Sequence, residues 1–300
     1  MPGEMSLGFA LEPGSEKTHI QHLEDWFRGL NGERLYRQSW LPDKEIKAVV
    51  LVVHGLFEHS GRYRNLAEYL VPRGFAVCSY DQRGHGRSEG LRGYVKRFSD
   101  FIDDLQTFHA LEAERFRGKP MFLFGHSIGG TIATVYFAGH QHDFAGGVFS
   151  AATVLPGSSV TRSSILVARA LSAVLPKIGV ALIDASGISR DRSVVDAYVN
   201  DPLVYRGKIR ARLGAELINT IERALPPKMS VIEGPILLVH GTEDRLSNTE
   251  GSALLYRSVK SKDRTLKYYK GFYHETLNEP GRDEVLSDIV SWLETHVKAR

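Results

Sequence analysis

A serine lies between two glycines at a spacing that suits a nucleophile. Gly125, Ser127 and Gly129 form a G-x-S-x-G pattern directly after an apolar run, residues 120–124, and directly before a helical pattern, residues 128–140. Such pentapeptides also arise by chance, but the strand–turn–helix context gives this one a mechanical reason. Small neighbours permit a sharp turn, and the turn projects the hydroxyl clear of the sheet edge. The pattern predicts that Ser127 is a nucleophile.

A serine hydroxyl needs a base that removes its proton, and histidine commonly supplies it. When the serine lies on such a turn, the chain order is serine, acid, histidine, which leaves His240, His274 and His296 as candidates. His240 ends an apolar run, and His296 lies in a C-terminal helical pattern. His274 follows the last predicted strand, in a loop that can reach the carboxyl edge of the sheet. We therefore expect His274 to be the base.

The acid of such a site orients the imidazole and stabilises the imidazolium that forms. Asp244 lies in a loop just after the apolar run 235–240, next to Glu243. Neighbouring side chains point in different directions, and we favour Asp244 as the acid. No carboxylate directly follows the run 144–150, which is the other place where an acid is expected.

Two backbone N–H groups are expected to bind the oxyanion that forms during attack. One is that of Ile128, at the start of the helix that follows the serine, where amides point toward the developing charge. The other should come from the loop after the apolar run 48–54, where Leu56 fits. Because backbone donors leave no side-chain signature, both predictions rest on position.

Other histidines do not indicate a phosphate or metal site. His85 lies in a glycine-rich segment, but no GK[ST] follows it, so we expect a turn with a buried, hydrogen-bonded histidine. His54 and His59 have no carboxylate or cysteine at ligand spacing around them. We expect neither a metal nor another cofactor.

The elements that must position these residues follow from the hydrophobic pattern. Apolar runs of strand length alternate with helical patterns, as is typical of a mostly parallel sheet covered by helices. The run 48–54 is rich in β-branched residues, as expected for a strand buried on both faces. The predicted strands are residues 48–54, 75–80, 120–124, 144–150, 235–240 and 265–269, and the predicted helices are residues 100–117, 128–140 and 284–297.

The alternation breaks between about residues 155 and 231, which contain helical patterns but no convincing strand. Residues 165–183 are apolar over most of their circumference. This segment is either a helix pair buried against the main domain or a cap whose apolar inner face receives an acyl chain, and the two interpretations are compatible.

Composition limits the location and the partners of the chain. Of 300 residues, 42% are hydrophobic and 24% are charged, as is typical of a globular protein. The first thirteen residues lack the basic and apolar regions of a secretory signal, and no apolar stretch reaches the roughly 18 residues of a membrane span. The single cysteine, Cys78, fits a reducing compartment. The net charge of +3 gives no support to nucleic-acid binding. We expect a cytoplasmic protein, with peripheral contact to anionic membranes as a further hypothesis.

Six motifs in a fixed order carry a family resemblance. Together they are more specific than any one alone. They are HGLFEHSGRY at residues 54–63, DQRGHGRSEG at 81–90, GHSIGG at 125–130, YVNDPL at 198–203, HGTEDRL at 240–246 and YHE at 273–275. On these residues, from about 45 to 297, the chain resembles the monoacylglycerol lipase family of serine α/β-hydrolases, which carry a hydrolase 4, or serine aminopeptidase S33-type, domain.

The resemblance implies an α/β-hydrolase fold with a helical cap inserted between the sixth and seventh strands. We expect residues 1–154 and 232–300 to form the core, with residues 1–20 extended, and residues 155–231 to form the cap. In the family the cap surrounds an acyl tunnel and docks on membranes.

The resemblance also implies residues that hold a glycerol head group. Glu58 and Arg62 lie in the first motif and Tyr198 in the cap motif, at the positions that have this role in the family. Without the resemblance, Glu58 and Arg62 read as a surface pair at i,i+4 spacing. The chain departs from the family at Leu56 and Phe57, where small residues are usual, and at Ile128, where methionine is usual. These changes add bulk beside the oxyanion donors but remove neither N–H group.

The expected function is hydrolysis of a monoacylglycerol to fatty acid and glycerol, through an acyl-enzyme on Ser127. A lysophospholipase or a broad carboxylesterase with the same triad is the alternative enzyme. Epoxide hydrolases and haloalkane dehalogenases share the fold but use an aspartate nucleophile. A non-catalytic ligand-binding protein would be expected to lack a triad residue, and Ser127, Asp244 and His274 are all present. The oligomeric state stays open.

Overall fold

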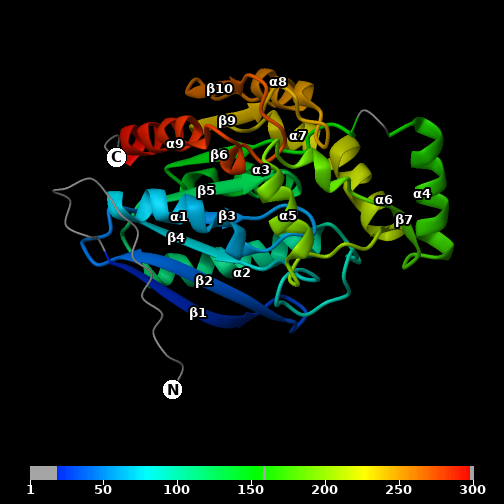
Figure 1. The fold of residues 1–300 in the computed structure, drawn as a ribbon, viewed down its shortest axis with the longest axis horizontal. Coiled ribbons are helices and arrows are strands. Elements are labelled where there is room, and N and C mark those ends of the chain that lie inside the picture. Colours follow the sequence, from blue (N-terminus) through cyan, green and yellow to red (C-terminus); the bar gives the residue numbers. More distant parts are fainter. Residues whose placement is uncertain (1–18, 158–159, 298–300) are drawn as a thin grey trace.

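The computed structural model describes residues 19–157 and 160–297, and an eight-stranded sheet forms its centre (Figure 1). Its order is β1-β2-β4-β3-β5-β6-β9-β10, parallel from β4 to β10 and antiparallel at β1 and β2. The strands are β1 Ile20–Arg28, β2 Arg34–Pro42, β3 Ala48–Val53, β4 Phe75–Tyr80, β5 Met121–His126, β6 Gly146–Ser150, β9 Ile236–Gly241 and β10 Arg264–Tyr269.

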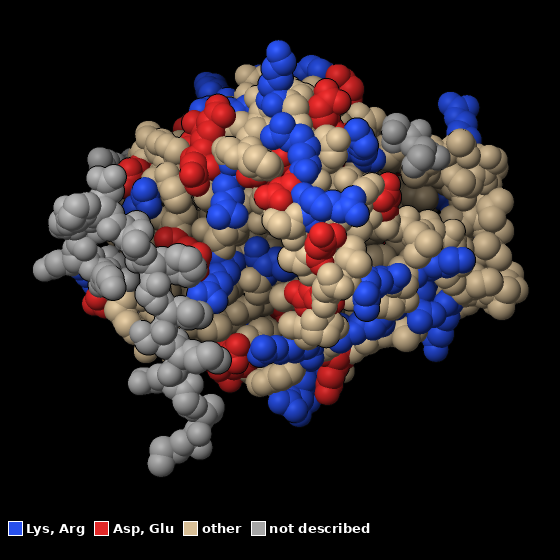
Figure 2. Space-filling view, viewed as in Figure 1, with Lys and Arg blue, Asp and Glu red and all other residues tan. Residues whose placement is uncertain are grey.

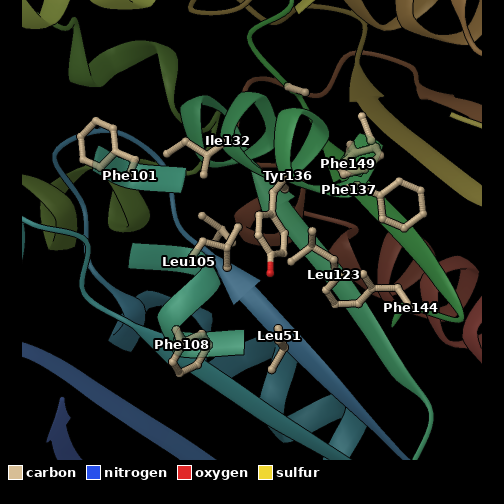
Figure 3. Close-up of a cluster of buried hydrophobic side chains, with 14 of the residues drawn as sticks. Leu51, Phe101, Leu105, Phe108, Leu123, Ile132, Tyr136, Phe137, Phe144 and Phe149 are labelled. Atoms are coloured by element: carbon tan, nitrogen blue, oxygen red, sulfur yellow. The ribbon is translucent and has the colours of Figure 1, made fainter. Parts of the chain in front are cut away.

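Both faces of the sheet are buried because its central strands are apolar on both sides. In β3, Val49, Leu51 and Val53 belong to one hydrophobic cluster, whereas Val50 and Val52 belong to the other. Figure 3 shows the first cluster, where α2 and α3 pack on the sheet. That face is covered by α2 Ser99–Arg115, α3 Ile128–His140 and α8 Thr249–Ser258, and the other face by α1 Arg64–Leu70 and α9 Arg282–Val297.

The mostly parallel sheet with flanking helices is confirmed, but the prediction lacked two strands. All six predicted strands and all three predicted helices are present, with ends shifted by a few residues. The strand β1 was missed because it is exposed along most of its length and carries Glu24 and Asp25 in the middle of its pattern. In β2, Arg37 and Gln38 interrupt the apolar residues. Residues 1–18 of the predicted extended segment, and the predicted absence of a signal there, lie outside the described residues, and Ile20 already begins β1.

Between β6 and β9, the sixth and seventh strands of this sheet, the chain leaves the sheet and forms small helices (Figure 1). The prediction of no strand in this segment was wrong, since β7 and β8 pair there as a short antiparallel hairpin. The segment contains α4 Arg162–Val174, β7 Gly179–Ala181, α5 Arg192–Asn200, β8 Ile209–Arg210, α6 Ala211–Asn219, a π-helix Thr220–Ala224 and α7 Leu225–Met229. Short 3₁₀ helices elsewhere and here are Ser60–Tyr63, Val71–Arg73, Gln141–Asp143, Ala185–Gly187 and Thr276–Asn278.

The interpretation of residues 165–183 as a buried helix pair was wrong. Only α4 is helical there, because Pro176 and Gly179 follow it and the chain then enters β7. Leu166 and Val174 on α4 are 65% and 78% exposed, so this helix does not bury its whole circumference. Across the described residues, no helix combines the length and the hydropathy that crossing a membrane requires.

Candidate active site

Ser127 lies on a strained turn between β5 and α3. Its φ and ψ are 56° and −123°, which non-glycine residues rarely adopt and which functional sites often retain. The turn is fixed by the N–H of Ser127, which donates to the carbonyl of Ser150 at 3.0 Å. Gly129 permits the helix to pass close to β3, since a side chain there would overlap the carbonyl oxygens of Val53 and His54. The predicted strand–turn–helix around Ser127 is therefore present.

His274 is hydrogen-bonded to Asp244 and lies in the same cavity as Ser127. Its Nδ1 is 2.7 Å from Oδ2 of Asp244, and His274 and Ser127 both line the cavity. No hydrogen bond joins Ser127 Oγ to Nε2 of His274 among the described residues, and such bonds in hydrolases often tighten only when substrate binds. The structure thus brings together the three residues that the sequence singled out.

Charges around this pair favour an ionised acid and a basic imidazole. Burial opposes the imidazolium, but the Asp244 carboxylate and its hydrogen bond outweigh burial and raise the pKa of His274. Burial likewise opposes the Asp244 carboxylate, but His274 and His240 hold the pKa of Asp244 well below its usual range. The backbone N–H groups of Leu246 and Ser247 donate to its other oxygen at 2.7 and 3.0 Å.

The cavity has a volume of about 920 Å³, at the upper end of ordinary ligand sites. Ser127 and His274 line it together with Gly55 and Leu56 of the loop that follows β3. The rest of its wall is largely aliphatic and comes from the segment between β6 and β9, including Val167, Leu171, Val180, Leu217 and Ile221. Such a shape accepts a long apolar chain at one end and a polar group beside the serine.

The two predicted oxyanion donors flank the serine. Leu56 and Ile128 both line the cavity, and within the described residues neither backbone N–H donates to another protein atom. The loop that carries Leu56 is fixed by Glu58, whose Oε1 accepts the N–H of Gly55 at 2.5 Å. The next residue, Phe57, is buried with φ 69°, and its carbonyl accepts the N–H of Tyr205 at 2.9 Å. The bulk of Phe57 therefore packs against Tyr205 and away from the two donors.

A buried ion network borders the cavity. Arg62 donates to both oxygens of Glu275, at 2.5 and 2.7 Å, and to Oε2 of Glu58 at 2.8 Å. The pair of Glu58 and Arg62, which the i,i+4 spacing suggested to be on the surface, is thus buried. The guanidinium of Arg62 also lies over the ring of Tyr198, at 4.8 Å from the ring centroid. Glu58, Tyr198 and Glu275 line the cavity, whereas Arg62 is not among its lining residues. Of the predicted head-group residues, Arg62 is placed to hold the others rather than to reach a ligand.

Three other histidines that the structure buries stay neutral at ordinary pH. Burial lowers the pKa of His54 to about 4 and the pKa values of His85 and His126 to about 3. His85 is hydrogen-bonded to the carbonyl of Arg83 in a turn, as its glycine-rich setting predicted. No cluster of metal-ligating side chains occurs in the part of the chain that the structure describes.

Sequence reasoning missed two contributors to the site. Glu275 stands directly after His274, but its ion pair with Arg62 joins residues 213 positions apart, which no spacing reveals. His240 was not chosen as the base because it ends an apolar run, yet its Nε2 lies 2.9 Å from Oδ2 of Asp244. The motif HGTEDRL at residues 240–246 was the available signal for His240, since it contains both the histidine and the acid.

Comparison with known proteins agrees with this geometry. Residues 44–281 match the family described as serine aminopeptidase, S33. The monoacylglycerol lipase of Mycolicibacterium smegmatis is 37% identical over 274 residues, which are 91% of this chain and 98% of that protein. The chain belongs to the S33 family. The monoglyceride lipase of Homo sapiens is also similar, with 41% identity over 81% of this chain and 80% of its own.

A solved structure extends the similarity to three dimensions. The crystal structure of Paleococcus ferrophilus monoacylglycerol lipase matches with a TM-score of 0.78 and 33% identity, over 87% of this S33 chain and 99% of that one. The family and the α/β-hydrolase fold that the motifs predicted are therefore confirmed.

Proposed function

We propose that this chain hydrolyses monoacylglycerols to fatty acid and glycerol through an acyl-enzyme on Ser127. The chain is a carboxylic ester hydrolase of the S33 family, and its relatives of 37–41% identity are monoacylglycerol and monoglyceride lipases. The observation that carries the proposal is the largely aliphatic cavity of about 920 Å³ whose wall includes Ser127 and His274.

The proposed mechanism assigns one step to each residue. His274 takes the proton of Ser127 as Oγ attacks the ester carbonyl, and Asp244 stabilises the imidazolium that forms. The N–H groups of Leu56 and Ile128 bind the resulting oxyanion. The imidazolium then gives its proton to the leaving glycerol oxygen. Water repeats the sequence on the acyl-enzyme and releases the fatty acid.

The charge of the polar end favours a neutral head group over a phosphate. Two carboxylates, Glu58 and Glu275, line the cavity there, and the one guanidinium between them already donates to both. The sum of Glu58, Arg62 and Glu275 is one negative charge, which disfavours an anionic group in a buried setting. Arg245 also lines the cavity, but its guanidinium lies over the ring of Tyr273, at 4.7 Å from the ring centroid. We propose Glu58 and Tyr198 as contacts of glycerol hydroxyls, held in place by Arg62.

A substrate comparison tests this assignment. We expect kcat/KM to be at least about tenfold higher for monoolein than for oleoyl lysophosphatidylglycerol, whose phosphodiester carries one net negative charge, the difference that about 1.4 kcal/mol of unfavourable head-group energy produces. A short p-nitrophenyl ester should be cleaved by the same site with a higher KM, because it leaves most of the aliphatic wall uncovered. Equal or faster turnover of lysophosphatidylglycerol would favour the lysophospholipase alternative.

We further propose that residues 155–231 act as a cap that contacts lipid surfaces. Of the fifteen large hydrophobic side chains that are exposed in the described residues, eight lie between Val160 and Leu182. Val167, Ile178, Val180 and Leu182 among them also line the cavity, so the apolar surface continues into its wall. An amphiphilic ester can therefore move from a lipid layer to Ser127 along apolar contacts.

Charge is distributed in the direction that this contact needs. Residues 155–231 contain eleven Lys and Arg and six Asp and Glu, a net charge of +5. The rest of the chain contains 27 Lys and Arg and 29 Asp and Glu, a net charge of −2. Figure 2 shows the same pattern, since the end formed by α4 and β7 is mainly tan and is bordered by blue side chains. A surface of this kind is attracted to anionic lipids.

Vesicle sedimentation tests the cap proposal. Leu166→Asp with Val174→Asp should weaken binding to phosphatidylglycerol-containing vesicles by about tenfold or more, because each carboxylate opposes burial in lipid and repels the anionic surface. The matched control is Leu111→Asp, a half-exposed leucine on α2 outside the cap, which should leave binding unchanged. Equal binding of the double variant and the control would remove the proposal.

A further inference from the structure

Two histidines, not one, are hydrogen-bonded to the same oxygen of Asp244. Oδ2 lies 2.7 Å from Nδ1 of His274 and 2.9 Å from Nε2 of His240. The other ring nitrogen of His240, Nδ1, lies 2.7 Å from Oγ of Ser252. A continuous chain of hydrogen bonds therefore runs from α8 through β9 to the candidate base.

His240 is placed as a fixed support and not as a ligand. Its side chain is fully buried at the end of β9, it does not line the cavity, and it contacts the acid only through a ring nitrogen. Because an ionised carboxylate only accepts, Nε2 of His240 must carry the proton in that contact. In the neutral ring Nδ1 is then an acceptor, and the Ser252 hydroxyl donates to it. Ser252 thus selects the tautomer that Asp244 requires.

We propose that His240 is a positioning residue of the reaction, which holds Asp244 in the orientation and with the basicity that His274 requires. The backbone N–H groups of Leu246 and Ser247 occupy Oδ1, and His240 shares Oδ2 with His274, so the carboxylate has no freedom to rotate. The inference deepens the proposed hydrolase mechanism and rests on it.

The support also sets how strongly Asp244 attracts the proton of His274. A donor at Oδ2 draws charge from the carboxylate, so removing it makes the oxygen more basic and stabilises the His274 imidazolium. Glu275 and Glu58 also favour the imidazolium, whereas His126, whose ring centroid lies 4.7 Å from that of His274, stays neutral in this pH range. None of these three changes when His240 is replaced. The acid limb of the pH–rate profile therefore reports the contact of His240 with Asp244.

A pair of amide substitutions separates positioning from packing. In His240→Gln the amide nitrogen takes the place of Nε2 and can still donate to Asp244. In His240→Asn the shorter amide takes the place of Nδ1 and cannot reach the acid. Both variants introduce a neutral polar group at one buried place, so they control for each other. The substrate should be p-nitrophenyl butyrate, because a result on a short ester is independent of whether monoacylglycerol is the natural lipid.

We expect His240→Asn to lower kcat by about tenfold with little change in KM, well short of the roughly 10⁴-fold loss seen when the acid of such a triad is neutralised. Its acid limb should move to higher pH, whereas His240→Gln should stay within about threefold of the wild type with an unshifted limb. Ser252→Ala should shift the acid limb in the same direction by a smaller amount. This variant tests the proposal if His240→Asn does not fold. The proposal would be overturned if the Asn and Gln variants lost kcat equally and neither shifted the acid limb. If the Asn variant does not fold, an unshifted acid limb in Ser252→Ala would overturn it. If the wild type itself did not hydrolyse p-nitrophenyl butyrate, the proposed function would be contradicted instead.

Discussion

The buried corner around Asp244 and the outer end of the cap, formed by α4 and β7, differ in how their side chains are covered. At the corner, every oxygen of Asp244 accepts hydrogen bonds from groups that the core fixes. At the cap end, Leu166, Val174 and Leu182 are more than half exposed. Exposed apolar surface of this extent is unusual for a part that serves stability alone.

The difference indicates a division of tasks within one chain. Proton transfer requires atoms held to a fraction of an ångström, which a sheet edge with satisfied polar groups provides. Uptake of an amphiphile requires an apolar surface that is open to lipid. The cap provides this surface with side chains whose exposure does not stabilise the fold. Substitutions at the corner should therefore change kcat, and substitutions at the cap end should change access to lipid substrates.

The largest effect is expected at the acid itself. Asp244→Asn should lower kcat on a short ester by about 10⁴-fold, because the amide favours the wrong tautomer of His274. The exposed neighbour Glu243, the alternative that the sequence left open, supplies the control. Glu243→Gln should retain wild-type kcat, and a larger loss in this variant than in Asp244→Asn would reverse the assignment. Steady-state kinetics with matched circular dichroism spectra measure both.

A smaller effect is expected from pH. His274 acts as a base only when it is deprotonated, and its raised pKa places the acid limb of kcat/KM above the usual value of about 6.5. Activity should therefore fall as pH decreases through that range, by about tenfold per unit below the limb. His54, at about 4, and His126, at about 3, titrate too low to contribute. A limb with its midpoint below 6 would show that Asp244 does not support His274 as described.

The smallest effect is expected at Phe57, where the loop after β3 contacts Tyr205 in the segment between β6 and β9. Its ring packs on Tyr205 at 4.9 Å between centroids, but its φ of 69° is unfavourable for any residue with a Cβ. Glycine normally destabilises relative to alanine, yet here Phe57→Gly should be more stable than Phe57→Ala by about 1 kcal/mol. Urea unfolding of the two variants measures the difference. Greater stability of the alanine variant would indicate that the loop relaxes out of this conformation.

The sequence predicted those parts of the fold that local patterns determine. The run that became β3 is apolar at every position, so its burial on both faces needed no knowledge of its neighbours. The edge strand β1 buries only Phe27 and is otherwise at least partly exposed, so its pairing with β2 left no clear periodicity. The end of α4 was missed although Pro176 marks it, because the apolar residues beyond the proline continued to resemble a helix.

The candidate site shows the same limit. Ser127, Asp244 and His274 were predicted because each lies in the turn or loop that follows an identifiable strand. The contacts of Arg62 with Glu275 and of His240 with Asp244 were not, because they depend on how loops from β3, β9 and β10 meet at one sheet edge. Chain order gives the members of such a site, and the fold determines which of them share a proton or an ion pair.

The most direct test of the account is turnover of monoolein by the wild type and Ser127→Ala, with the reaction quenched during the steady state and the protein analysed by mass. We predict that the wild type releases oleate and carries an oleoyl group on the peptide that contains Ser127. The alanine variant should remain folded, lose at least about 10⁴-fold in rate and carry no adduct. Sustained oleate release by Ser127→Ala, or an oleoyl group on another residue of the wild type, would contradict the central claim.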